Sequence, residues 1–469
     1  MSHQDRGRER AMGSHADDLL EAFRWLTPKH SLSGLAFRRD CTWTPWRLAF
    51  AALLWAWSDH RNLLDRFGHA RKIIEHLFGK QHEPAGSYQA FIKLLRKWTP
   101  ALLECLTLAF RQKMVASLSA AWTIAGWQVF AVDGSRVGVP RTRANEQRYS
   151  PKSKLSRAAQ QRRRARRRRQ REKEARQRQA NVPQIWLTTL WHVASGLSWA
   201  WQTGASDSSE RAHLVAMLAT LPPGAVLVAD AGFVGYELWR TVLQARLHLV
   251  VRVGGNVKRL KKLGYARESS ERVYLWPERA AADQGPLPLR LIVSHNGRHP
   301  VYLVTDLKPT ELSHRAAIEI YARRWGIELF YRHCKQTFER AKLRSQNPDN
   351  ALIELHWSLL GMWAMGLHSH ARLVQRGIAP RKISFAGVLR AYRESMREYR
   401  WRPPRGERLV ARLDGALIDD YIRRDKTSRD YPRKKQTTAA GQPIILLATR
   451  QQRRKANQIN EQEKKRLTA

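Results

Sequence analysis

The hydrophobic pattern of this chain changes its period near residue 126. From residue 16 to about 122, apolar residues recur every three or four positions, the spacing that places them on one face of an α-helix. Thr44 before Pro45 is a typical helix start, and Pro100 is expected to open a further helix. After residue 126, apolar runs of strand length alternate with helical stretches. The pattern therefore predicts an all-helical N-terminal domain followed by an α/β domain.

Two of the predicted strands end in an aspartate. The stretch "GWQVFAVDGSRVGVP" contains Asp133, and "GAVLVADAGFVGYELW" contains Asp230. A third strand, "VYLVTDL", directly precedes a predicted helix that carries Glu328. Each aspartate comes shortly before a glycine and would also suit a turn. Because α/β sheets present functional groups at the ends of their strands, we expect the three carboxylates to converge.

Three carboxylates at one point would repel one another unless a cation lay between them. Carboxylate oxygens suit Mg²⁺ or Mn²⁺, hard ions that also bind substrate phosphate. Two such ions about 4 Å apart can activate the attacking oxygen and stabilise the leaving oxygen when a phosphodiester is displaced. Asp133, Asp230 and Glu328 are therefore the expected metal ligands and catalytic residues.

The charge of the chain indicates the partner. Its 84 Lys and Arg residues outnumber its 40 Asp and Glu residues, which gives a formal net charge of +44. Such an excess favours a polyanion, with nucleic acid as the leading candidate and a membrane surface as the rival. The longest apolar run, residues 48–57, is too short to span a bilayer. Cys41, Cys105 and Cys334 have no metal-ligand spacing and fit a reducing cytosol.

A dense arginine run interrupts the predicted α/β domain. Residues 154–179 have helix-forming composition but no apolar stripe to bury. Two interpretations stay open: a solvated insertion, and a segment that becomes ordered on a phosphate backbone. On the second interpretation the candidate DNA contacts are Arg162, Arg163, Arg164, Arg166 and Arg167.

The predicted helix "YARRWGIELFYRHCKQ" places Tyr321, Arg324, Glu328 and Lys335 three, four and seven residues apart. On one α-helix these steps return to nearly the same angle, so the four side chains would share a face. Taken alone, Arg324 and Glu328 could be an ordinary solvated ion pair. If Glu328 binds metal, however, the same face would lie along DNA. Arg324 and Lys335 would then bind phosphate, and the Tyr321 hydroxyl would donate to it.

This spacing resembles the Tyr-Arg-Glu-Lys signature of the DDE insertion-sequence transposases. "VDGSRVGVP" and "ADAGFVGYELW" resemble the two aspartate segments of that family, and the resemblance covers about 125–370. It implies a ribonuclease-H-like core, a central mixed sheet flanked by helices and interrupted by a β-rich insertion. It also implies metal-dependent cleavage at transposon ends, followed by attack of the freed 3′-hydroxyl on target DNA.

The resemblance implies further roles and partners. In the best-known relatives excision passes through a DNA hairpin, the signature Tyr and Arg hold the terminal phosphate, and an insertion Trp stacks on a flipped base. Trp276 is the corresponding candidate here, although it would equally suit a buried position. The implied partners are double-stranded DNA, as terminal inverted repeats and target, and a second subunit on that DNA. Neither a membrane nor a small-molecule substrate is expected, and the expected location is the cytoplasm, on the bacterial nucleoid during activity.

The expected fold is α/β, with five regions along the chain. These are a helical N-terminal domain that is a candidate for binding DNA ends (1–124), the first part of the core (125–254), the β-rich insertion (255–300), the second part of the core (301–375) and a basic C-terminal region (376–469). Two alternatives to the transposase remain. One is a transposase-derived DNA-binding protein without catalysis, and the other is a different metal nuclease on the same scaffold.

Overall fold

The computed structural model describes most of the chain. The residues described are 13–37, 41–79, 86–151, 182–254, 266–267, 272–275, 285–296, 299–418, 450, 454, 457–458 and 461–462. The arginine run at 154–179 and Trp276 lie outside the described residues.

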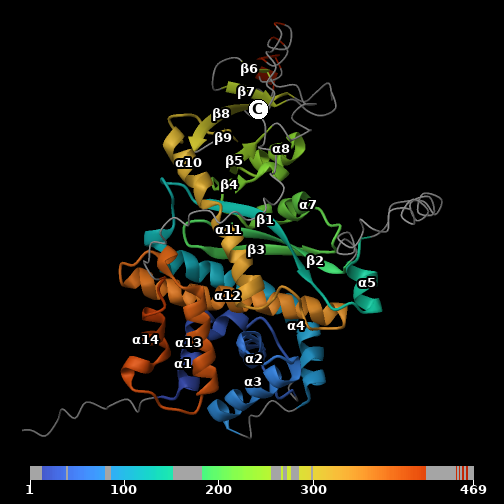
Figure 1. Ribbon diagram of the computed structural model, residues 1–469, viewed down its shortest axis with the longest axis vertical. Helices are drawn as coiled ribbons and strands as arrows, with labels where there is room; N and C mark the ends of the chain where they lie inside the picture. The colour runs from blue at the N-terminus through green and yellow to red at the C-terminus, as the bar shows by residue number, and fades with distance from the viewer. Residues whose placement is uncertain are drawn as a thin grey trace, which may run out of the picture.

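The described elements follow the predicted change of period (Figure 1). The helices before the first strand are α1 (His15–Leu26), α2 (Pro45–Trp57), α3 (Leu63–Phe78) and α4 (Tyr88–Ser117). The alternating region contains β1 (Val129–Gly138), α5 (Arg143–Tyr149), β2 (Gln184–His192), β3 (Leu197–Gly204), α7 (Glu210–Met217), β4 (Val226–Ala229), α8 (Tyr236–Gln244) and β5 (His248–Val253). It continues with β6 (Ala266–Arg267), β7 (Arg272–Leu275), β8 (Leu287–Asn296), β9 (His299–Thr305), α10 (His314–Arg323) and α11 (Gly326–Arg332). The chain then forms α12 (Pro348–Gln375), α13 (Phe385–Arg397) and α14 (Leu409–Asp414).

The strands form one mixed sheet with the order β3-β2-β1-β4-β5-β9-β8-β7-β6. β1, β4 and β5 are parallel, whereas β2 and β3 form an antiparallel hairpin beside β1. β9 pairs antiparallel with β5 and connects it to β8, β7 and β6. The strands of the predicted β-rich insertion therefore extend the central sheet. The predicted α/β class with a helical N-terminal region is confirmed.

One predicted helix boundary is wrong. Pro100 does not begin a helix but lies inside the 30-residue α4. A proline in a helix interior removes one backbone hydrogen bond. The helix continues because its apolar face is buried on both sides of the proline, through Phe91, Leu95, Leu102 and Leu106. The predicted start at Thr44 and Pro45 is confirmed, since the Thr44 hydroxyl accepts a hydrogen bond from the Arg47 amide.

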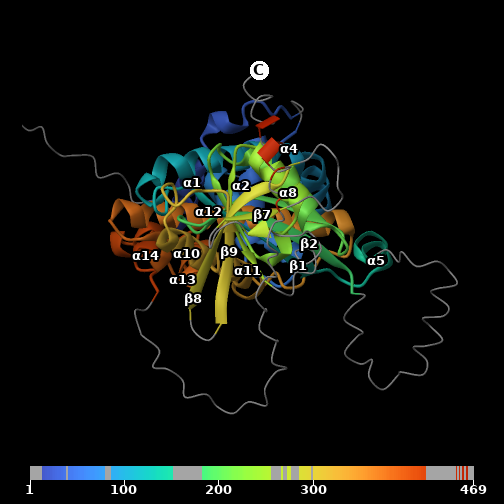
Figure 2. The ribbon, with the colours of Figure 1, turned by 90° about the horizontal axis from the view of Figure 1, so that it is seen from above.

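A helical layer lies beneath the sheet in Figure 1, and the view from above in Figure 2 shows the two overlapping. The largely buried α12 packs against α2 and α4 on one side and touches β3 on the other. At the α2 contact, the indole nitrogen of Trp57 donates to the carbonyl of Gly361 at 3.0 Å. A Cβ on Gly361 would lie 2.9 Å from that nitrogen, so the close approach requires glycine.

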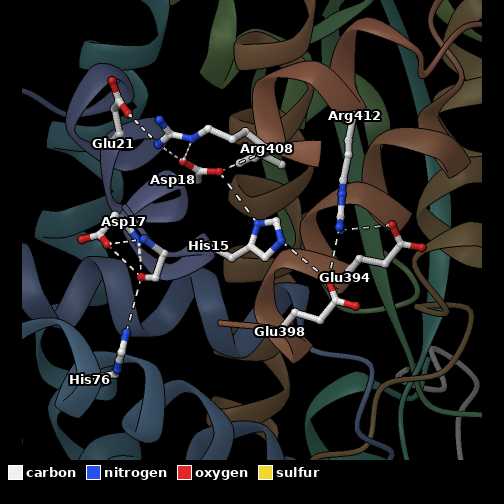
Figure 3. A network of polar contacts seen from close by, with 11 residues as sticks. His15, Asp17, Asp18, Glu21, His76, Glu394, Glu398, Arg408 and Arg412 are labelled. Atoms are coloured by element: carbon white, nitrogen blue, oxygen red, sulfur yellow. Dashed lines mark hydrogen bonds and ion pairs between the residues drawn. The ribbon is translucent and has the colours of Figure 1, made fainter. Parts of the chain in front are cut away.

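Polar contacts join α1 to α13 and α14 (Figure 3). Asp18 on α1 is buried and accepts hydrogen bonds from the Arg408 Nε at 2.8 Å and the Leu409 amide at 3.0 Å. His15 Nε2 lies 3.6 Å from Glu398, which also pairs with Arg412. N-terminal helices and C-terminal helices therefore pack together in the helical layer. In the described part of the chain, no helix combines the length and apolarity needed to cross a bilayer.

Candidate active site

Asp133 lies within β1, where the strand passes from fully buried to half-buried positions. Its Oδ1 accepts a hydrogen bond from the adjacent Gly134 amide at 2.8 Å. Burial, together with the nearby charges of Asp230 and Glu328, raises the pKa of Asp133 to about 6, against the opposing effects of the Gly134 amide and Arg324. The carboxylate is therefore held where a negative charge is poorly compensated.

Asp230 directly follows β4, the strand beside β1. Ala131 pairs with Val228 in this parallel ladder, and two residues farther along each strand stand Asp133 and Asp230. Neighbouring strands are about 4.8 Å apart, so the register brings the two aspartates side by side. Asp230 also serves the turn that follows, because its Oδ1 accepts a hydrogen bond from the Gly232 amide at 2.8 Å. The turn role and a place in the carboxylate group are therefore compatible.

Glu328 comes from α11, which packs against β1. The contact is anchored by the buried Tyr331, whose hydroxyl donates to the backbone carbonyl of Asp133 at 2.7 Å. Because Tyr331 is three residues after Glu328 on the same helix, this bond fixes the helix beside Asp133. Glu328 is near enough to Asp133 to contribute to its raised pKa, after the larger effect of burial.

The structure changes the predicted signature helix. Tyr321 belongs to α10, Glu328 belongs to α11, and Lys335 lies in a π-helical turn, His333–Thr337, so the four residues do not share one continuous α-helix. A Cβ on Gly326, the first residue of α11, would lie 2.0 Å from the ring of Trp191. Only glycine fits this contact, and it lies where the helix is interrupted.

The signature side chains nevertheless stay near the carboxylates. Arg324 donates to Glu328 at 3.0 Å, and its guanidinium lies 5.6 Å from the centre of the Tyr321 ring. Lys335 Nζ donates to the hydroxyl of Ser135, two residues after Asp133, at 2.7 Å. Burial lowers the pKa of Lys335. Both cations therefore face the part of β1 that carries Asp133.

A fourth carboxylate lies near Asp133, and the sequence pattern did not group it with the other three. Glu210 is the first residue of α7, and a Cβ on Gly134 would lie 2.5 Å from its Oε1. Burial raises the pKa of Glu210 to about 7, and Asp133 and Asp230 contribute in the same direction. In the sequence, Glu210 looks like an ordinary acid in the first turn of a helix. The glycine that follows Asp133 was the one signal of a close approach.

The donor chemistry suits a hard divalent cation. The carboxylates lie at the ends of adjacent strands and on helices that pack against them. Burial and, after it, neighbouring negative charge raise the pKa of Asp133, and a bound cation would offset both effects. Among the described residues, however, no three acidic, histidine or cysteine side chains lie close enough together to hold an ion. Glu328 instead faces Arg324, and both aspartates accept hydrogen bonds from backbone amides.

Comparison with known proteins identifies the family. The profile of the family described as "Transposase DDE domain" matches residues 125–363, just over half of the chain. A solved structure described as the piggyBac transposase synaptic complex with hairpin DNA is 11% identical, covers 88% of each chain and has a TM-score of 0.41, a likeness too distant to carry an argument. A search of curated proteins found no match. On the strength of the profile match, which spans the strands with both aspartates and the helix with Glu328, the chain belongs to the transposase DDE domain family.

Proposed function

We propose that this protein is a DNA transposase that cleaves phosphodiester bonds at transposon ends and joins the freed 3′-hydroxyl to target DNA. The observation that carries the proposal is the register of β1 and β4, which sets Asp133 beside Asp230 while Tyr331 ties the Glu328 helix to the same strand. Family membership supports the same reaction class. The large positive charge of the chain suits a DNA substrate.

The proposed catalytic core is ribonuclease-H-like. The mixed arrangement β3-β2-β1-β4-β5, with helices α7, α8 and α11 between or after its strands, supports this assignment. The strands β6, β7 and β8 then correspond to the β-rich insertion. The divisions at 124, 254, 300 and 375 remain part of the proposal.

Asp133, Asp230 and Glu328 would together hold two divalent ions, either Mg²⁺ or Mn²⁺. The bound metal would supply Lewis-acid activation of the attacking and leaving oxygens. Arg324, with its planar guanidinium, would bind phosphate when Glu328 turns to the metal. Tyr321 and Lys335 would contact the same DNA strand. DNA-end binding by the N-terminal helices, a hairpin intermediate and a dimer on DNA belong to the proposal as well.

The test is a cleavage and joining assay on duplexes that carry the element's own ends, with MgCl₂ or MnCl₂. Asp133→Asn, Asp230→Asn and Glu328→Gln should each reduce both steps about a thousandfold or more, the effect of about 4 kcal/mol in the barrier. Glu319→Gln is a matched control, because Glu319 forms an exposed i,i+4 pair with Arg323 on α10. Full activity in any of the three variants would remove that carboxylate from the catalytic set.

The products of the wild-type protein distinguish the alternatives. Strand-joined products indicate a transposase, whereas nicks without joining indicate a different metal nuclease. Binding to the element's ends without either product would indicate a DNA-binding protein that has lost catalysis.

A further inference from the structure

A second polar pocket lies between α13 and the segments that follow α2 and α11. It has a volume of about 260 Å³, and its polar lining consists of Asp59, Thr337, Arg390, Arg393 and Arg397. The lining thus contains three arginines and one carboxylate. None of these residues belongs to the carboxylate site described above.

The helical period brings the three arginines together. Arg390, Arg393 and Arg397 are separated by three and four residues, so they share one face of α13, while Leu389, Tyr392 and Met396 are among the residues that bury the rest of the helix. A purely structural role explains part of this face. Arg393 Nε donates to the carbonyl of Trp57 at the end of α2 at 3.1 Å, and Arg397 lies 3.4 Å from the carboxylate of Asp59.

Arg390 is not explained by that structural role. It is exposed, and within the described part of the chain no hydrogen bond or ion pair engages its guanidinium. Arginine is the side chain best suited to phosphate, because its planar fork of N–H groups matches two phosphate oxygens. The Thr337 hydroxyl in the same pocket is a further donor.

The surroundings of the pocket strengthen its preference for an anion. Arg66 and Arg340 are buried nearby, and burial lowers the pKa of both. Burial also lowers the pKa of Arg393, and Arg397 adds to this effect while Asp59 and Glu339 oppose it. Cations outnumber anions at this junction, so a bound phosphate would reduce their mutual repulsion.

The pocket is joined to the carboxylate site by a short segment. The π-helical turn His333–Thr337 carries Lys335, which contacts Ser135 beside Asp133, and ends at Thr337 in the pocket. The ring of His333 stacks on that of Phe385, the first residue of α13, at 5.0 Å and 7°. The π-helical turn thus lies between Lys335 near Asp133 and the arginines of α13.

Resting on the proposed function, we infer that this pocket binds a backbone phosphate of the DNA at a position away from the cleaved bond. The guanidinium of Arg390 is the group that binds this phosphate. Arg393 and Arg397 line the site and also secure the end of α2. The contact positions DNA and takes no part in the chemical step. It adds sequence-independent affinity, since a phosphate carries no base information.

The experiment measures the affinity of the full-length protein for a duplex carrying one element end over a series of NaCl concentrations. Arg390→Ala should weaken binding by about tenfold, the loss of one charge-assisted contact. It should also reduce the slope of log K against log salt by about 0.9, the value for one phosphate. Arg402→Ala is the matched control. Arg402 is also exposed, and its substitution removes one positive charge at a position outside the pocket.

A chemical scan of the DNA locates the contact. Replacing single phosphates by neutral methylphosphonates should reveal one position, away from the cleaved bond, where wild-type affinity falls about tenfold. In Arg390→Ala this penalty should disappear, and Arg390→Lys should restore part of the affinity.

Equal effects of Arg390→Ala and Arg402→Ala would overturn the inference, because they would reflect net charge alone. An undiminished methylphosphonate penalty in Arg390→Ala would overturn it as well. Failure of the wild-type protein to bind or cleave element ends would instead contradict the proposed function, so the two failures can be distinguished.

Discussion

Two aspartates in this molecule are withdrawn from water, and their surroundings shift their pKa values in opposite directions. Asp18, in the helical layer, is 5% exposed. Burial alone would raise its pKa, but interactions with His15, Arg408 and the Leu409 amide hold it below the usual value. Asp133, in the sheet, has its pKa raised to about 6 by burial and by the neighbouring carboxylates Asp230 and Glu328.

The difference separates a structural carboxylate from a candidate functional one. Asp18 receives a cation and two N–H donors from its own fold, so its charge is compensated when the chain folds. Asp133 receives one amide hydrogen bond, and Arg324 offsets only part of the effect of burial and of the like charges around it. A fold that confines uncompensated charge gives up stability at that site, and such sites are where binding and catalysis concentrate.

The largest expected effect on stability comes from Asp18→Ala. It leaves the Leu409 amide without an acceptor and Arg408 with only the exposed Glu21. Because Asp18 is buried while Arg408 is partly exposed, the loss should lie near the lower end of the range for a broken buried pair, about 3 kcal/mol. Urea denaturation measures the loss. Glu21→Ala is the control, since Glu21 is exposed and lies 3.9 Å from the same guanidinium. Equal losses in the two variants would show that the buried hydrogen bonds of Asp18 stabilise the fold no more than the exposed Glu21 does.

Asp133→Asn is expected to act in the opposite direction on the metal-free protein. Removing the uncompensated charge should stabilise the fold by about 1–3 kcal/mol near pH 8, because a pKa difference of about two corresponds to roughly 3 kcal/mol. Adding MgCl₂ or MnCl₂ should raise the melting temperature of the wild-type protein and have no such effect on the variant. If Asp133→Asn is less stable than the wild-type protein and is still stabilised by metal, Asp133 is not a poorly compensated carboxylate that binds the ion.

The two aspartates should also give opposite dependences of stability on pH. Asp133 holds its proton more tightly in the folded state, so its contribution to the free energy of unfolding falls as pH rises from about 4 to about 6. The pKa of Asp18 is lowered on folding, so its contribution is present above the unfolded pKa and is lost as pH falls through the folded one. Urea denaturation of the metal-free protein across this range should show a smaller decline of stability between about pH 4 and about pH 6 in Asp133→Asn, and a smaller loss of stability in acid in Asp18→Asn.

The smallest effect is expected for Gly134→Ala. The new Cβ would meet the end of the Glu210 side chain, which can rotate away, so the cost should be about 1 kcal/mol or less. The displaced carboxylate should lower the pKa of Asp133, which NMR titration of the metal-free protein can follow. In the Glu210→Ala background the same glycine substitution should cost less. An equal cost in both backgrounds would show that Glu210 does not lie against Gly134 in solution.

Much of this architecture could be predicted from local patterns. The helical period before residue 126, the apolar strands before Asp133 and Asp230, and the helix start at Thr44 all depend on residues close together in the sequence. Neither the pairing of β1 with β4 nor its register follows from the sequences of the two strands. The metal and DNA roles of the carboxylates and of Tyr321, Arg324 and Lys335 stay predictions.

Other features depend on contacts between distant parts of the chain. Pro100 remains inside α4 because packing on both sides outweighs one lost hydrogen bond. The signature region is divided between α10, α11 and a π-helical turn, and Gly326 accommodates the ring of Trp191 at the break. Glu210 reaches Asp133 only because α7 folds back over β1. The spacing of apolar residues within a short stretch of sequence does not predict these long-range contacts.

By itself, the sequence determined the class of elements, the strand ends at which acids stand and the cationic character of the whole chain, because these follow from side-chain spacing and composition. Tertiary structure alone decided which charges are compensated. Asp18 meets Arg408 across 390 residues, whereas Asp133 meets Asp230, Glu328 and Glu210. The physical reason is that the energy of a buried charge depends on its neighbours in space, and those neighbours are set by the packing of the helical layer and the sheet.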